Sequence, residues 1–256
     1  MAPSVLVPLP DRGFDVTEVA VPWKLLGERG VDVVFATEAG ATPAADPTLL
    51  EGVVFGQLGA EPEPKSFYYE LEQAAAFRAP LRWHDCDFEA FDGLLLAGGH
   101  AAGMRQLLGS ELLQRRIAGF FSLGRPVGAI CHGVLPLARA LDPATGRSLL
   151  HGRRTTCLPR YLERLAYYLT AWKLGRHYRT YPAYVEDEVV GALASAADFS
   201  RGPISLGARG TRSDHRPAFV VEDGHYLSAR WPGDSYLFAE RFHHLLTGAP
   251  AAGSGA

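Results

Sequence analysis

Cys131 is the side chain of this sequence whose neighbours point most directly to chemistry. It stands in the run Pro126-Val127-Gly128-Ala129-Ile130-Cys131-His132-Gly133, where an apolar strand pattern gives way to a helical one. Small residues around a nucleophile allow a sharp strand-to-helix turn, the nucleophile elbow, which presents the side chain at the carboxyl end of a sheet. The positive end of a helix dipole there favours thiolate over thiol. We therefore predict that Cys131 is a nucleophile.

Glycines and histidines close to this turn could supply the other groups that such chemistry needs. The stretch Gly98-Gly99-His100 follows a predicted strand, and glycine there lets backbone amides approach a substrate oxygen. His132 follows the nucleophile directly, and an imidazole transfers protons near neutral pH. Simpler interpretations stay open, because a glycine pair after a strand is also an ordinary turn and a histidine at a helix start is also a packing residue.

The elements that must position these residues follow from the hydrophobic pattern. Short β-branched runs alternate with longer segments of helical period, which favours a parallel sheet with helices on both faces. Strands are expected at residues 4–7, 31–37, 93–97 and 126–130, with a hairpin of residues 219–221 and 226–229 around Asp223-Gly224. The fold class is therefore α/β, with a mostly parallel central sheet between two helical layers.

Helices are expected between these strands. The first crossover helix spans about residues 16–26, and another follows at 66–77 after an irregular stretch at 40–65. Apolar residues of helical period also run from Met104 to Phe121, with a break at Gly109-Ser110, and from Leu158 to Trp172. A last helix, capped by Asp234, spans about residues 235–246. With no repeat and no linker, we predict one domain over residues 1–247 and a flexible tail at 248–256.

Composition excludes several classes of function. The 256 residues are 47% hydrophobic and 21% charged with a net charge of −3, so no basic surplus indicates a nucleic-acid partner. No apolar run approaches the roughly 20 residues that a membrane-spanning helix needs, and the N-terminal segment does not resemble a signal peptide. Three cysteines without framework spacing indicate reduced thiols. We expect a cytoplasmic protein with no nucleic acid and no membrane as partner.

The sequence also offers little that would hold a metal or a cofactor. It contains no GxGxxG, Walker or zinc-finger spacing. The run His84-Asp85-Cys86-Asp87 has metal-binding residue types, but consecutive side chains point in different directions and no distant pair matches them. Cys86 and Cys157 lack the flanks of Cys131 and are expected to be buried, inert thiols. We expect neither a metal nor a cofactor.

Three motifs together resemble the ThiJ/PfpI (DJ-1-like) superfamily. They are Ala-Ile-Cys-His-Gly at 129–133, Leu-Leu-Ala-Gly-Gly-His at 95–100 and Asp-Val-Thr-Glu-Val-Ala-Val-Pro-Trp at 15–23. The resemblance runs from the first strand to Ser-Ala-Arg-Trp-Pro-Gly-Asp at 228–234, which is nearly the whole chain. It implies the class-I glutamine-amidotransferase-like fold, a three-layer sandwich of flavodoxin-like type.

The resemblance also implies roles for two acids. Glu18 matches the glutamate that contacts the nucleophilic cysteine in that family, and a proton shared between carboxyl and thiol is expected there. The local alternative is that Glu18 closes a capping box with Asp15 at the start of its helix. Glu163 lies where the family draws the third member of a Cys-His-acid triad, although a lone glutamate on an amphipathic helix is also a solvated charge. His132 would be the base or orienting partner.

The remaining implied groups bind the substrate. The family forms an oxyanion hole from the loop after the strand and from the amide that follows the cysteine, which here gives Gly98, Gly99 and the backbone of His132, with His100 as an optional contact. The motif Cys-His is closest to the glyoxalase III and chaperone-type branch. It implies a cofactor-independent cysteine enzyme for a small carbonyl or acyl substrate, of the type that converts methylglyoxal to lactate.

Two other functions fit the same residues. One is a cysteine amidase or peptidase of PfpI type, in which water resolves an acyl intermediate. The other is a redox-sensing chaperone without catalysis, in which Cys131 is oxidised to a sulfinic acid. Relatives of this kind often dimerise, so the resemblance also implies a homodimer.

Overall fold

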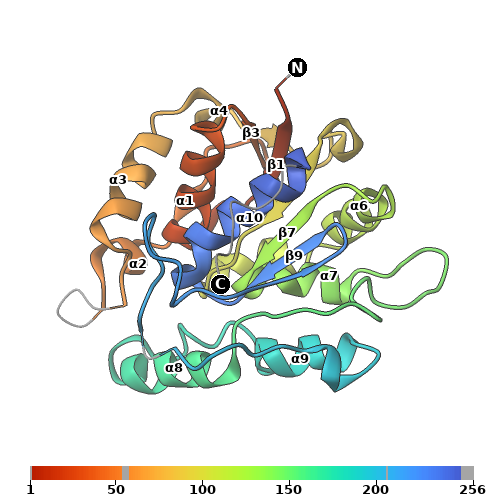
Figure 1. Cartoon of the computed structure of the whole chain (residues 1–256). Helices are drawn as coiled ribbons and strands as arrows, with labels where there is room; N and C mark the ends of the chain where they lie inside the picture. Colours follow the sequence, from red (N-terminus) through yellow and green to blue (C-terminus); the bar gives the residue numbers. More distant parts are fainter. Residues whose placement is uncertain (1, 54–57, 206, 249–256) are drawn as a thin grey trace.

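A seven-stranded sheet forms the centre of the computed structural model, which describes residues 2–53, 58–205 and 207–248 (Figure 1). The strand order is β5-β3-β1-β6-β7-β9-β8, and every neighbouring pair is parallel except β8 with β9. The strands are β1 Ser4–Pro8, β3 Asp32–Thr37, β5 Leu81–Arg82, β6 Gly93–Leu96, β7 Val127–Ile130, β8 Val220–Asp223 and β9 Tyr226–Ala229. This confirms the predicted α/β fold class.

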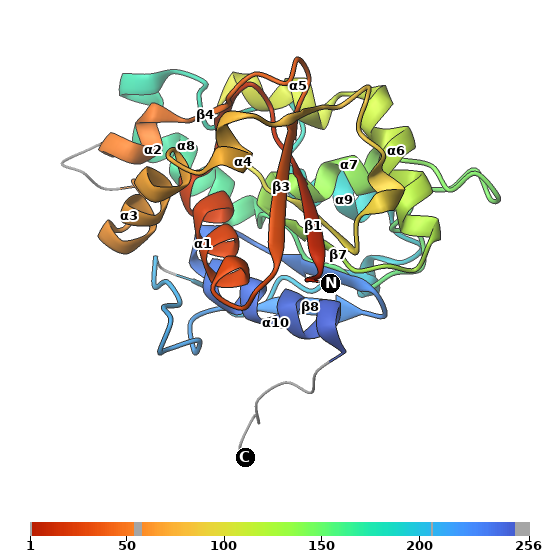
Figure 2. The same ribbon diagram turned by 90° about the horizontal axis from the view of Figure 1, so that it is seen from above.

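The helices cover both faces of this sheet. On one face α1 (Val16–Gly27), α3 (Pro62–Leu71) and α10 (Ser235–Thr247) pack together, and on the other lie α5 (Arg105–Leu108), α6 (Glu111–Ser122) and α7 (Leu135–Arg139) (Figure 2). A central strand that is covered by helices on both faces consists of a continuous apolar run, and Val127–Ile130 is such a run, buried at every residue. The three-layer arrangement is therefore as predicted.

Register brings two loops to the same edge of the sheet. Strands β6 and β7 are parallel neighbours in which Leu96 lies opposite Ala129. The chain leaves β6 at Ala97-Gly98-Gly99 and leaves β7 at Cys131. Because parallel strands end at one edge, the glycine loop and the cysteine turn lie side by side.

The structure refines the predicted helices and the predicted irregular stretch. The helix expected at 66–77 begins earlier, at Pro62, and is divided into α3 and α4 (Ala75–Arg78). The expected break at Gly109-Ser110 is found, since the Ser110 hydroxyl accepts a hydrogen bond from the Leu113 amide (3.3 Å) and caps α6. The irregular stretch contains β4 (Ala44–Ala45), paired with β2 (Arg12–Phe14), and α2 (Pro47–Glu51).

Two further helices, α8 (Arg160–Leu174) and α9 (Val185–Ala192), lie along one edge of the molecule (Figure 1). The helix predicted from the apolar period at 158–172 is present, but its apolar stripe faces outward. Its buried positions are Glu163 and Thr170, whereas its exposed large side chains are Leu165, Tyr168, Leu169 and Trp172. Polar contacts to α9, made by Glu163 and Glu186, help to hold α8 in place.

The C-terminal hairpin and helix match their predicted positions. Strands β8 and β9 pair antiparallel, and Gly224 between them has a φ of 60°. Asp234 stands at the start of α10, but its carboxylate binds Arg230 and the Phe219 amide, so the expected side-chain cap is absent. Apart from Gly248, the expected tail at 248–256 lies outside the described residues. Within the described ranges no helix is both long and apolar enough to cross a bilayer.

Candidate active site

Cys131 sits at a strained turn. Strand β7 ends at Ile130, a 3₁₀ turn spans Cys131–Val134, and Cys131 has a φ of 59°, a region that non-glycine residues rarely adopt. A Cβ at Gly133 would lie 2.1 Å from the Leu96 carbonyl oxygen, so this position has to be glycine. The sharp elbow predicted from the small flanking residues is therefore present.

Gly98 lies in contact with the main groups of the site. A Cβ at this residue would lie 2.7 Å from the His132 amide nitrogen, 2.8 Å from Glu18 Oε2 and 2.9 Å from Cys131 Cβ. The Gly98 amide donates to Glu18 Oε2 at 2.7 Å. That amide is already used within the protein, so Gly98 serves close approach rather than the substrate contact expected of it. Gly99 packs against the backbone of Gly13 and Asp15.

Asp15 explains why Glu18 points to the sulfur. The Asp15 carboxylate accepts hydrogen bonds from the Thr17 and Glu18 amides at 2.8 and 3.1 Å, and it caps α1. The Asp15 amide, which a capping box would pair with Glu18, donates to the Gly98 carbonyl instead (2.9 Å). The capping-box alternative for Glu18 is therefore wrong, and its Oε1 has no hydrogen-bond partner in the part of the chain that the structure describes.

Cys131 and Glu18 form a buried acid–thiol pair. They are 1% and 2% exposed. Burial raises the pKa of Cys131 well above its usual range, and the nearby Glu18 and Asp15 charges add to this, while the His132 amide opposes it. Burial and the Asp15 charge likewise raise the pKa of Glu18. The pair therefore retains a proton that either atom can hold.

This outcome corrects the expectation that the turn itself favours thiolate. Only a 3₁₀ turn and the five-residue helix α7 follow Cys131, so little helix dipole acts on the sulfur. Desolvation outweighs that effect. Formation of a thiolate in this site therefore requires a proton acceptor close by.

His132 is placed to accept that proton, and His100 packs against it. Cys131 Sγ lies 3.5 Å from His132 Nδ1, and the His100 and His132 rings meet edge to face with centroids 4.7 Å apart. Burial lowers the pKa of both imidazoles, that of His100 to about 4, so both are neutral at neutral pH. A neutral imidazole beside a thiol can act as a general base.

Comparison with known proteins shows which family this chemistry belongs to. The family model described as ThiJ/PfpI family-like matches residues 9–203 of the chain. The chain belongs to the ThiJ/PfpI family. This confirms the resemblance carried by the three motifs.

Relatives of this ThiJ/PfpI protein include named enzymes. A deglycase of Pyrococcus abyssi is 25% identical over 233 residues, which cover 91% of this chain and 93% of that protein. Glyoxalase III of Candida albicans has the same fold, with a TM-score of 0.69, 20% identity and coverage of 95% and 97% of the two chains. DJ-1β of Drosophila melanogaster superposes with a TM-score of 0.58 at 17% identity, covering 97% of this chain and 92% of that one.

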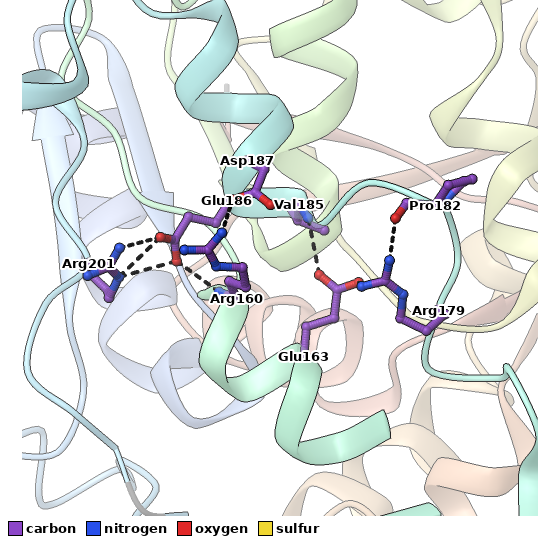
Figure 3. Close-up of polar contacts among 8 residues, drawn as sticks. All are labelled: Arg160, Glu163, Arg179, Pro182, Val185, Glu186, Asp187 and Arg201. Atoms are coloured by element: carbon purple, nitrogen blue, oxygen red, sulfur yellow. Dashed lines mark hydrogen bonds and ion pairs between the residues drawn. The ribbon is translucent and has the colours of Figure 1, made fainter. Parts of the chain in front are cut away.

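Glu163, the expected triad acid, binds elsewhere in this structure. Its Oε2 accepts the Val185 amide at 3.1 Å, which is the first amide of α9, and its Oε1 lies 3.9 Å from Arg179 (Figure 3). His132 Nε2 has no hydrogen-bond partner among the described residues. The structure therefore does not join Glu163 to His132, and the triad assignment stays a prediction.

The contacts of Glu163 are half of a reciprocal arrangement. Glu186, in the first turn of α9, accepts the Arg160 amide at 2.8 Å, which is the first amide of α8, and it also binds the Arg201 guanidinium (Figure 3). Each helix thus supplies the carboxylate that satisfies the other's N-terminus. Burial raises the pKa of Glu163 to about 7 despite the Val185 amide and Arg179.

Sequence reasoning missed Tyr178. Tyr178 is 3% exposed, and its ring lies 4.8 Å from that of His100. It belongs to a connection without periodic pattern, so no local signal marks it. The N-cap that the capping box assigns to Asp15 is present, since its carboxylate accepts the Glu18 amide, whereas the Glu18 side chain binds the Gly98 amide instead of returning to Asp15. Among the described residues, no three His, Cys, Asp or Glu side chains are grouped to hold a metal.

Proposed function

We propose that this protein is a cofactor-independent cysteine enzyme that acts on a small carbonyl compound in the manner of a glyoxalase III. The observation that carries the proposal is the buried Cys131 at a strained turn, with Glu18, the His132 amide and Cys131 itself gathered around Gly98. Enzymes hold strain and buried titratable groups where chemistry needs them. A structural thiol would need neither.

The chemistry follows from these groups. A neutral His132 takes the Cys131 proton, the sulfur adds to the aldehyde carbon, and the carbonyl electrons move to oxygen as an oxyanion that backbone amides stabilise. A base then moves the proton from that carbon to the neighbouring carbonyl carbon, which converts the adduct into a 2-hydroxy thioester. Water releases the 2-hydroxy acid and restores the thiol. Glu18, which shares a proton with the sulfur, is the second proton carrier.

A sequence relative and a structural neighbour support this proposal: the first is named a deglycase, and the second, which shares the fold, is named glyoxalase III. The amidase and redox-chaperone alternatives use the same cysteine, and the test below separates them. A homodimer and a cytoplasmic location stay predictions.

The test is turnover of methylglyoxal by the purified protein without added thiol. We expect lactate to form and Cys131→Ala to abolish it. Cys157→Ala, which changes a buried thiol hydrogen-bonded to the Leu158 carbonyl, should leave turnover within about twofold. Ammonia released from amides or cleavage of peptides, with no lactate, selects the amidase. No turnover, with selective oxidation of Cys131 by dilute peroxide, selects the redox chaperone.

A further inference from the structure

The nucleophile is covered, so a substrate cannot reach it without movement. Cys131 and His132 are each 1% exposed. The cavity that Glu18 lines, otherwise bordered by apolar side chains such as Val19 and Phe238, has a volume of about 10 Å³. That is room for about one water molecule. Something that covers the site must move during the proposed reaction.

The covering element on the histidine side is the connection between α8 and α9, residues 175–184. It carries Tyr178, whose ring meets His100 with centroids 4.8 Å apart. It also carries Thr180, whose hydroxyl donates to the His100 carbonyl oxygen at 2.8 Å. Since His100 in turn contacts His132, this connection closes over the residues next to the sulfur.

Each of these three neighbouring rings carries a buried polar atom without a partner in the described part of the chain: Tyr178 Oη, His100 Nε2 and His132 Nε2. Buried polar groups in proteins are almost always hydrogen-bonded, so three unpaired ones in consecutive rings beside a nucleophile need an explanation. We infer that Tyr178 is a substrate-binding residue of this site, that its hydroxyl and the two imidazoles bind the substrate's oxygen atoms, and that residues 175–184 lift to admit it. This inference rests on the proposed function.

The chemistry of the three groups defines the substrate class. Burial, with the Asp46 and Asp15 charges, raises the pKa of Tyr178, so the phenol is a neutral donor. Both imidazoles are neutral as well. A neutral site pairs well with an uncharged compound that has two neighbouring oxygens, such as a vicinal dicarbonyl. It leaves a carboxylate without a counter-charge among these groups.

Side-chain contacts hold the connection, and these must break when it lifts. Besides Thr180, its polar contacts include His177 Nε2 to Asp46 Oδ2 at 2.8 Å, Arg105 Nε to the Thr180 carbonyl at 2.7 Å, and Arg179 to Glu163 at 3.9 Å. The Tyr181 ring also meets the Arg139 guanidinium, whose Cζ lies 4.3 Å from the ring centroid. Its ends, at Gly175 and at Pro182 and Ala183, are exposed. Segments with few buried contacts open at low free-energy cost.

The first experiment removes one oxygen. Tyr178→Phe deletes a hydroxyl that the protein leaves unpaired, so we expect the melting temperature to be unchanged or higher while kcat/KM for methylglyoxal falls at least fivefold. Tyr226→Phe is the matched control, because the Tyr226 hydroxyl bonds Thr155 Oγ1 at 2.8 Å. It should lower the melting temperature and leave kcat/KM within about twofold. Unchanged kcat/KM in Tyr178→Phe overturns the substrate-binding role.

The second experiment measures access to Cys131 without any turnover. Thr180→Val removes the tie to the His100 carbonyl, and we expect iodoacetamide to alkylate Cys131 at least threefold faster than in the wild type. Thr170→Val, which removes a hydrogen bond to Ala166 within α8, is the control and should not change the rate. Equal rates in wild type and Thr180→Val overturn the lifting of this connection.

A failure of the proposed function is distinguishable from a failure of this inference. Should the wild type form no lactate, Tyr178 is tested by the protection that methylglyoxal gives Cys131 against iodoacetamide. Protection that Tyr178→Phe weakens at least threefold supports the substrate contact although the enzyme proposal fails. Protection that is absent in the wild type, or unchanged in the variant, overturns it.

Discussion

Glu18 and Glu163 are both buried glutamates in the first turn of a helix, yet they serve different purposes. Each accepts one backbone amide from a distant segment, Gly98 at 2.7 Å and Val185 at 3.1 Å, and burial raises the pKa of each. Glu18 faces a thiol and another carboxylate, whereas Glu163 faces the Arg179 guanidinium. Burial alone therefore does not identify a catalytic acid. A buried glutamate is identified as one by a neighbouring group that can exchange a proton with it, as Cys131 can with Glu18.

The largest test of this comparison replaces each glutamate by glutamine. Glu18→Gln removes the group that shares a proton with Cys131, and we expect turnover of methylglyoxal to fall about 10²- to 10⁴-fold, the usual contribution of a general acid–base group. Glu163→Gln should change it less than about threefold, because the structure does not join Glu163 to His132. Steady-state kinetics of the two variants measure both. An equally large loss in Glu163→Gln would instead restore the triad.

A smaller loss of turnover is expected when a substitution at Gly98 displaces the groups that contact it. Gly98→Ala adds a Cβ less than 3 Å from the His132 amide, Glu18 Oε2 and Cys131 Cβ, so these groups must shift by some tenths of an ångström. A misplacement of about 1 Å costs on the order of 10²-fold in rate, and we expect a loss of up to that size. Gly27→Ala, at a position where an added Cβ meets nothing within 4 Å, is the control. Full activity of Gly98→Ala would show that the gathered groups are not the catalytic ones.

The pH dependence of stability tests the structural role that the comparison with Glu18 assigns to Glu163. Its pKa is about 7 in the folded protein against 4.5 for an ordinary glutamate, so the folded state binds its proton more tightly. This contribution to stability is complete below pH 4.5 and is lost as pH rises to about 7, by about 3 kcal/mol at most. Urea unfolding should therefore show Glu163→Gln gaining stability relative to wild type over that range. A difference that does not vary with pH would mean that folding leaves the pKa of Glu163 unchanged.

The sequence predicts the Cys131 turn and the neighbouring glycine loop well, because the residues that specify them are close together in the chain. A strand pattern, a cysteine and glycines on either side specify a turn, and Gly98 and Gly133 are where a Cβ would collide with neighbouring backbone. Parallel strands then bring the glycine loop to the cysteine without further information. The resemblance to a family assigned Glu18 to the site, whereas the local pattern alone left capping and function open for it.

The edge formed by α8 and α9 could not be predicted in the same way. The partners of Glu163 are a backbone amide 22 residues away and an arginine in a connection without periodicity. The apolar period of α8 indicates a helix but not the direction of its stripe, which faces outward. Residues 175–184 pack against His100, and their position follows from tertiary contacts such as Thr180 to His100.

The smallest expected effect is on stability and concerns Glu186, the carboxylate that caps the N-terminus of α8. Burial acts to raise the pKa of Glu186, but hydrogen bonds from Arg201 and the Arg160 amide outweigh it and hold the pKa below its usual value. Its stabilisation is thus present above pH 4.5 and is lost as pH falls through the lowered pKa, opposite in sign to Glu163. Glu186→Gln should cost about 1 kcal/mol at pH 7, since Arg201 is half exposed, and this difference should shrink in acid. Urea unfolding at pH 7 and in acid measures this. If turnover in Glu186→Gln falls together with stability at pH 7, the caps between α8 and α9 also hold the catalytic groups in place. The contrast between a catalytic Glu18 and a structural Glu163 would then no longer stand.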